Sequence, residues 1–158
     1  MRLAHLARRF FESVRARPLD PVQQRAVEAL LQPGERPLFW GQQPLDQRHA
    51  YEAAASIAAA APDRLDLRRA ALLHDVGKRH ARLGVIARVL ASLTAVAGLR
   101  ARGRWAAYLD HAALGAADLA AIGSDDVVVA FARHHHEADA PPGVDAGDWA
   151  LLRAADGE

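Results

Sequence analysis

The chain has 158 residues, of which 51% are hydrophobic and 25% charged, as in an ordinary folded domain with a hydrophobic core. It has no cysteine, which excludes disulfide scaffolds, thiolate metal sites and cysteine nucleophiles. Its formal net charge of +1 gives no electrostatic reason to expect a nucleic-acid or membrane-surface binder.

Alanine makes up roughly a quarter of the chain, and because alanine favours helices over strands, the composition predicts an all-α fold. In the N-terminal part, Asp20 followed by Pro21 predicts a capped helix over 21–31. The stretch 32–44 carries three prolines and two glycines, which predicts a loop held against the core by Phe39 and Trp40. A first helix is predicted over 2–16 from apolar residues at helical spacing, namely Leu3, Leu6, Phe10 and Val14.

Further helices are expected over 46–61, from Asp63 or Asp66 to about Gly77, over 80–99 with Gly84 as a candidate break, and over 105–122. A helix beginning at Ser124 carries the run VVVAFARHHH, and a last helix begins at an aspartate cap, Asp145 or Asp148.

No repeat or domain-sized linker interrupts this order. We therefore expect one compact multi-helix bundle, with residues 1–44 as N-terminal helices and a loop packed on a domain formed by 45–158. No apolar run approaches the roughly 20 residues of a membrane-spanning helix, and the arginine-rich N-terminus lacks the apolar core of a secretory signal. The expectation is a cytoplasmic protein.

The chain has eight histidines, and six of them share a setting. A lone histidine is usually a surface or satisfied core residue, and His5 and His80, which lie among arginines, fit that description. The other six lie beside apolar residues on different expected helices, and two aspartates also end apolar runs. Because buried imidazoles and carboxylates must be paired or bind a metal, they predict a shared polar centre. Its candidates are His49, His74, Asp75, His111, His134, His135, His136 and Asp156.

The donor types indicate which ions such a centre would take. Imidazole nitrogens combined with carboxylates suit Mn, Fe, Co, Ni or Zn better than Mg or Ca alone. An aspartate can bridge two ions about 3.5–4 Å apart, an arrangement that can hold a hydroxide at neutral pH in line with a phosphate. We expect one or two divalent transition-metal ions.

Lys78 is the only lysine, against nineteen arginines, and it follows the His74–Asp75 pair closely. A compact ammonium suits a single phosphoryl oxygen next to metals, which makes Lys78 a candidate phosphate contact. The alternative is that it only interacts with the C-terminal end of a helix dipole. Arg79 and Arg133 are further candidates for substrate contact, with solvated helix faces as the alternative. Arg48 and Arg82 have the same two interpretations.

Taken in order, the pattern H…HD…H…H…D over His49 to Asp156 resembles the HD-domain superfamily of metal-dependent phosphohydrolases. The segments ALLHDVGK, HAALGAADL, RHHHE and LLRAADGE are similar to segments of its HD-GYP branch. Two features differ from that branch. The D-G-x-G-Y-P segment after HHE is missing, and Leu45 stands where trinuclear members carry a glutamate. The resemblance therefore does not extend to a third ion or to cleavage of cyclic dinucleotides.

The resemblance implies an HD-domain bundle that hydrolyses a phosphomonoester or phosphodiester, a nucleotide above all, with metal-activated hydroxide. Asp75 and Lys78 would act in catalysis, and Lys78, Arg79 and Arg133 would contact the substrate. His134 is expected outside the ligand set. The ligands implied are His49, His74, Asp75 and Asp156 at one ion, and His111, His135 and His136 at a second, with Asp75 shared.

Two other functions stay open at this point. One is a regulatory or scaffold HD-domain protein without catalysis, and the other is a di-iron oxygenase of HD type, because ligand types alone do not separate it from a hydrolase. The sequence does not predict the oligomeric state.

Overall fold

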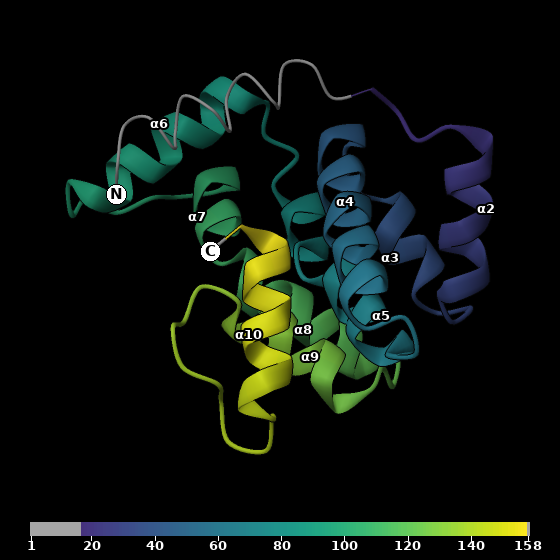
Figure 1. Cartoon of the computed structure of the whole chain (residues 1–158). Coiled ribbons are helices and arrows are strands. Elements are labelled where there is room, and N and C mark those ends of the chain that lie inside the picture. The colour runs from purple at the N-terminus through teal and green to yellow at the C-terminus, as the bar shows by residue number, and fades with distance from the viewer. Residues whose placement is uncertain (1–16, 158) are drawn as a thin grey trace.

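The computed structural model describes residues 17–157, which form a bundle of helices (Figure 1). No strand occurs in this range, so the predicted all-α fold is confirmed. The helix predicted over 2–16 lies outside the described residues. The elements, of which η1 is a 3₁₀ helix, are α2 (Pro21–Leu30), α3 (Arg36–Trp40), α4 (Pro44–Ala60), α5 (Leu65–Leu73), η1 (Val76–His80), α6 (Val85–Val96), α7 (Arg104–Leu109), α8 (His111–Ala121), α9 (Asp126–His134) and α10 (Ala146–Asp156).

One hydrophobic core joins most of these helices. Helix α5 packs against α4 and α9, α8 packs against α9, and α10 packs against α4 and α5. Ile57, Leu72 and Phe131 are buried at the centre of this arrangement, and Val27 and Phe39 from the N-terminal part belong to the same core. Full burial of one such side chain stabilises the fold by about 1.5–3 kcal/mol. The core therefore holds the helices, and with them the helix ends, in fixed positions.

Two predicted helix caps are present, and a third is wrong. Asp20 accepts hydrogen bonds from backbone amides at the start of α2, and Asp145 does the same for α10. At α5, by contrast, neither candidate aspartate is the cap, because the N-cap position is Arg64. Helix α9 begins at Asp126 rather than at Ser124, whose hydroxyl donates to the buried carboxylate of Glu35.

Several predicted boundaries also need correction. The predicted loop over 32–44 contains the short helix α3, although Phe39 is fully buried in the core as expected. The helix predicted to reach Gly77 ends at Leu73, and the chain continues as η1. The helix predicted over 80–99 shortens to α6, and the one over 105–122 is split at Asp110. The final two histidines of HHH lie beyond the end of α9.

Helices η1 and α8 touch backbone to backbone at a pair of glycines. A Cβ atom on Gly77 would lie 1.9 Å from the carbonyl oxygen of His111 and 2.6 Å from the amide nitrogen of Gly115. No side chain larger than hydrogen fits there. The contact holds the turn after α5 directly against the first turn of α8.

Helices α6 and α7 form a smaller unit beside the bundle, in which α6 lies apart from the other helices (Figure 1). Ala81, Leu83 and Ala91 form its small separate core, with Trp105 and Tyr108 packed against it. Within residues 17–157, no helix has both the length and the apolar character needed to cross a bilayer.

A buried ion pair connects α6 to the bundle. The Arg88 guanidinium donates to both oxygens of Asp46 in α4, at 2.5 and 2.7 Å, and its Nε donates to the carbonyl of Leu83. The amide of Gln43, just before α4, also donates to Leu83 O at 3.2 Å. The start of α4 is therefore the point at which α6 is attached.

Candidate metal centre

The seven predicted ligands come together from five parts of the fold. One lies in the second turn of α4, two lie in the turn between α5 and η1, and one begins α8. Two more directly follow α9, and the last ends α10. In that order they are His49, His74, Asp75, His111, His135, His136 and Asp156.

His49, His74 and Asp156 form the first of two groups. One potential ligand atom from each residue lies within 4.8 Å of the other two. The Oδ1 atom of Asp156 is 2.7 Å from His49 Nε2 and 3.2 Å from His74 Nε2. His74 and Asp156 are buried, whereas the side chain of His49 is 31% exposed, so solvent reaches this group from the α4 side.

His111, His135 and His136 form the second group, again with one atom from each within 4.8 Å of the others. The Nε2 atoms of His111 and His136 face each other at 3.3 Å. His111 and His135 are buried and His136 is exposed, so this group also has one open side.

Asp75 lies between the two groups, with one oxygen toward each. Its Oδ2 atom is 3.4 Å from His74 Nε2 in the first group. Its Oδ1 atom is 3.3 Å from His111 Nε2 and 3.6 Å from His135 Nε2 in the second. A carboxylate in this position has the geometry of a bridge between two cations.

Backbone carbonyls orient three of the histidine rings. The Nδ1 atoms of His74, His111 and His135 each contact the carbonyl oxygen three residues earlier, at 2.9, 2.7 and 3.1 Å. A carbonyl can only accept, so each Nδ1 must carry a proton, and in the neutral form of each ring Nε2 has a lone pair toward the centre. This is the usual arrangement around a metal-binding histidine.

Unsatisfied atoms at the centre fit a cation. In the described part of the chain, His74 Nε2, Asp75 Oδ1 and His135 Nε2 are buried and make no hydrogen bond. Buried polar atoms are nearly always paired, and a nitrogen or carboxylate oxygen without a donor is a ready ligand for a metal ion. The residues present therefore fit divalent transition-metal ions.

The electrostatics of the centre also favour a cation. Burial opposes a charge on His74, but the carboxylates of Asp75 and Asp156 outweigh it and raise the pKa of His74 to about 10. Burial likewise opposes ionisation of Asp75, yet the positive charges of Lys78 and His74 hold its pKa well below the usual range. The carboxylates thus stay charged and attract positive charge, and a cation bound by His74 would take the place of the proton on its Nε2 atom.

The pKa of His135 shifts in the opposite direction to that of His74. Burial first, and then the positive charge of His74, lowers the pKa of His135 to about 3. Burial and the neighbouring His111 also lower the pKa of His136. Both rings are therefore neutral at pH 7, as a metal ligand requires.

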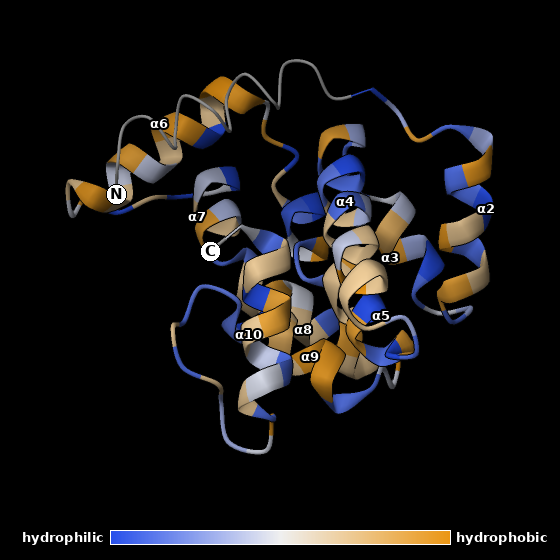
Figure 2. Ribbon diagram, viewed as in Figure 1, coloured by the Kyte–Doolittle hydropathy of each residue, from blue (hydrophilic) through white to orange (hydrophobic). Residues whose placement is uncertain are grey.

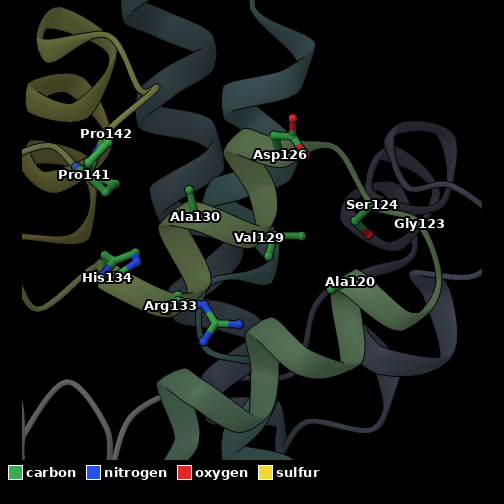
Figure 3. A pocket seen from close by; sticks show the side chains of 10 residues that line it. All are labelled: Ala120, Gly123, Ser124, Asp126, Val129, Ala130, Arg133, His134, Pro141 and Pro142. Atoms are coloured by element: carbon green, nitrogen blue, oxygen red, sulfur yellow. The ribbon is translucent and has the colours of Figure 1, made fainter.

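The predicted substrate contacts lie in different places. Lys78 pairs with Asp75 Oδ2 at the edge of the centre, and its side chain is only 13% exposed. Arg79 points to Asp118, with 2.7 Å between Nη2 and Oδ2. Arg133 is exposed and lines a pocket of about 520 Å³ on α9 (Figure 3). None of the seven candidate ligands lines that pocket.

Two of the three histidines that the sequence interpretation sets apart lie outside the centre. His134 Nδ1 contacts Glu137 at 2.7 Å and also lines the pocket on α9. His80 Nε2 contacts Asp118 at 2.7 Å. His5 lies outside the described residues.

Tyr108 is a neighbour of the centre that sequence reasoning missed. Its ring stacks on His111 with 5.8 Å between the two ring centroids, and the Arg88 guanidinium carbon lies 5.9 Å from the Tyr108 ring centroid. The same residue provides the carbonyl that orients His111. The only sequence signal is its position three residues before a candidate ligand.

The fold and the centre define an all-α protein with a buried histidine–aspartate cluster suited to divalent cations. A family model described as HD domain matches residues 47–155, well over half of the chain. The chain belongs to the HD domain family, whose superfamily is one of metal-dependent phosphohydrolases. Comparisons with curated proteins and with solved structures give no match. The closer likeness to the HD-GYP branch stays a prediction.

Proposed function

We propose that the protein is a metal-dependent hydrolase of phosphate esters, with a phosphomonoester or phosphodiester, in particular a nucleotide, as its substrate. The observation that carries the proposal is the position of Asp75. Its two oxygens face two separate histidine groups, which is the donor arrangement of a bridged pair of ions.

The chain's own residues hold this arrangement. His49, His74 and Asp156 would bind one ion and His111, His135 and His136 a second, with Asp75 in contact with both. When bound, the ions supply a water molecule of lowered pKa and positive charge beside the phosphoryl oxygens. The carbonyl contacts of the buried histidines keep their rings from turning, so the ligand atoms need little reorganisation.

Lys78 is the proposed phosphate contact. Its ammonium has three donors and already touches Asp75, so a second donor can bind a phosphoryl oxygen at the edge of the centre. Such a contact offsets the charge that develops on the phosphoryl group in the transition state. Arg79 and Arg133 stay proposed contacts for parts of the substrate farther from the phosphate.

The test is phosphate-ester turnover by purified protein loaded with Mn²⁺. We expect release of nitrophenol or phosphate from p-nitrophenyl phosphate, bis-p-nitrophenyl phosphate or one of the common nucleotides, and loss of this release when EDTA is added. No turnover by a protein with bound metal would contradict the proposal. Bound iron without turnover would favour an oxygenase, and absence of both metal and turnover would favour a scaffold.

A further inference from the structure

Helix α6 presents an apolar surface to solvent. Its inner side buries Arg88 and Ala91, and in Figure 2 much of its ribbon has the colour of hydrophobic residues. The large apolar side chains on its other side are between 45% and 81% exposed, and monomeric proteins rarely leave a contiguous stripe of this kind in water without a function. The α6 apolar surface consists of Ile86, Leu90, Leu93 and Val96, and of Leu99 directly after the helix.

The polar side chains of α6 need no partner outside the protein. The Ser92 hydroxyl donates to the Arg88 carbonyl oxygen at 3.0 Å. The Thr94 hydroxyl donates to the Ala91 carbonyl oxygen at 2.7 Å. The Arg88 guanidinium, the only charged group of the helix, is bound to Asp46 of α4. Because its polar side chains are satisfied in this way, α6 can enter an apolar environment without losing their hydrogen bonds.

The charge around α6 has one sign. Residues 76–109, which include η1, α6 and α7, contain one lysine and six arginines but no aspartate or glutamate. Residues 110–157, by contrast, carry nine acidic residues and two arginines. The small net charge of the chain therefore conceals one strongly basic segment, and α6 lies within it.

Four of these arginines have no carboxylate partner. Lys78, Arg79 and Arg88 each pair with an aspartate. Within the described range 17–157, no carboxylate forms an ion pair with the others, which are exposed and flank α6 in the chain: Arg82 before the helix, and Arg100, Arg102 and Arg104 after it. Their charges are therefore available to an anionic partner.

An apolar surface flanked by unpaired arginines suits an anionic lipid surface. Apolar side chains of such a helix enter the boundary between headgroups and acyl chains, while arginines beside it reach the phosphate groups. Each basic residue held near an anionic leaflet contributes about 1 kcal/mol to binding. A nucleic acid would attract the same arginines but would leave the apolar side chains in water.

A second copy of the chain matches this surface less well. Pairing of α6 with α6 of another copy would bring together two basic segments that contain no carboxylate, and such like-charge contacts oppose association. The other large apolar side chains exposed in the described structure are isolated along the chain and do not form one helix face: Val22, Leu65 and Ile122. Charge and apolar character together favour lipid as the partner.

We propose that α6 docks the protein on an anionic membrane surface, with the α6 apolar surface toward the lipid and the four flanking arginines at the level of the headgroups. The helix has 12 residues and an apolar stripe on one side, so it lies along the interface and does not cross the membrane. Because α6 lies apart from the other helices, the bundle with the metal centre stays in water (Figure 1).

Sedimentation of the full-length protein with vesicles tests this docking. We expect binding to vesicles of phosphatidylcholine and phosphatidylglycerol in equal parts, and binding about tenfold weaker to phosphatidylcholine alone, because the arginines then face no net negative charge. Leu90→Glu with Leu93→Glu should weaken binding to the mixed vesicles by about tenfold or more, since lipid would bury both leucines. The matched control, Val22→Glu with Leu65→Glu, adds the same charges at positions 66% and 53% exposed and should bind like the wild type.

A fluorescent label shows which part of the protein meets the lipid. The chain has no cysteine, so Leu93→Cys provides a single site for the polarity-sensitive dye nitrobenzoxadiazole, with Val22→Cys as the control site. On addition of mixed vesicles we expect the emission of the label at residue 93 to shift to shorter wavelength and that of the control label to stay unchanged. If circular dichroism shows that the glutamate variant loses helix, this label provides the test.

Each other outcome overturns the proposal. Absence of binding to the mixed vesicles, equal binding to both kinds of vesicle, or wild-type binding by a folded glutamate variant would show that α6 and its arginines do not dock on anionic lipid. Vesicle binding without a shift of the label at residue 93 would place the contact elsewhere in the chain. A wild-type dimer that Leu90→Glu with Leu93→Glu separates, without vesicle binding, would assign the surface to a second copy. Vesicle binding requires no turnover, so these outcomes are independent of the proposed function.

Discussion

A backbone contact decides which nitrogen of each buried histidine faces the centre. In His74, His111 and His135 the Nδ1 proton is held by a carbonyl three residues earlier, so the Nε2 lone pair has only one direction. The three carbonyls belong to the last turn before each histidine. A helix end is suited to this role, because its last carbonyls have no intrahelical partner.

The adjacent histidines His134 and His135 give a direct contrast at this scale. His135 Nε2 is buried and makes no hydrogen bond, whereas His134 is bound to Glu137 away from the centre. We expect His135→Ala to lower bound metal and to reduce phosphate-ester turnover by about 100-fold or more, because even loss of a ligand's supporting partner costs 10–100-fold. His134→Ala should stay near the wild type. Metal analysis and turnover are the measurements, and the reverse order would refute the assignment.

Substitution of Lys78 distinguishes an effect on substrate binding from an effect on metal binding. Lys78→Ala should leave the metal content unchanged and lower kcat/KM by about 10²–10³-fold, because it removes a positive charge from the phosphoryl group. Lys78→Arg keeps the charge on a larger group and should recover only part of the activity. Wild-type kinetics in Lys78→Ala would show that Lys78 only interacts with the C-terminal end of a helix dipole.

At the scale of elements, a glycine pair fixes the distance between two ligands. Gly77 and Gly115 let η1 lie against α8 with no side chain between them. Asp75 immediately precedes η1 and His111 begins α8, so this contact sets the separation of the bridging carboxylate from a histidine of the second group.

Gly77→Ala therefore tests whether this close contact is required. The added Cβ would overlap the carbonyl oxygen of His111, so we expect a loss of about 1–3 kcal/mol or more in the free energy of unfolding. Gly84→Ala is the matched control, because no atom lies within 4 Å of the added Cβ, and it should change stability by no more than about 0.5 kcal/mol. Urea denaturation measures both, and equal stability would contradict the role given to the contact.

Of the features of the fold, the helix boundaries are the ones that the sequence predicts least well. The breaks after Leu73 and at Asp110 carry no proline and no glycine at the break itself, so local propensity favours continuous helices there. Tertiary packing overrides this local preference. Each break directs a ligand toward the centre. The caps at Asp20 and Asp145 were predictable, since their chemistry is local.

At the scale of the whole molecule, residue type and order predict which side chains meet. Histidines and aspartates at the ends of apolar helical runs are brought inward by the same core that buries those runs. The sequence does not predict the distances between these side chains or their orientations. Nothing in the order of residues shows that Asp75 divides its oxygens between two groups, or that Asp46 and Arg88 connect α6 to the bundle.

The stoichiometry of bound metal tests the central claim most directly. Asp75→Ala removes the carboxylate between the two groups, and Asp118→Asn is a control carboxylate that contacts Arg79 and His80 outside the centre. After loading with Mn²⁺ and removal of excess, mass spectrometry of the metal should find about two ions per chain in the wild type and the control, and no more than about one in Asp75→Ala. Equal ratios in all three proteins, or no bound metal in the wild type, would contradict the bridged centre.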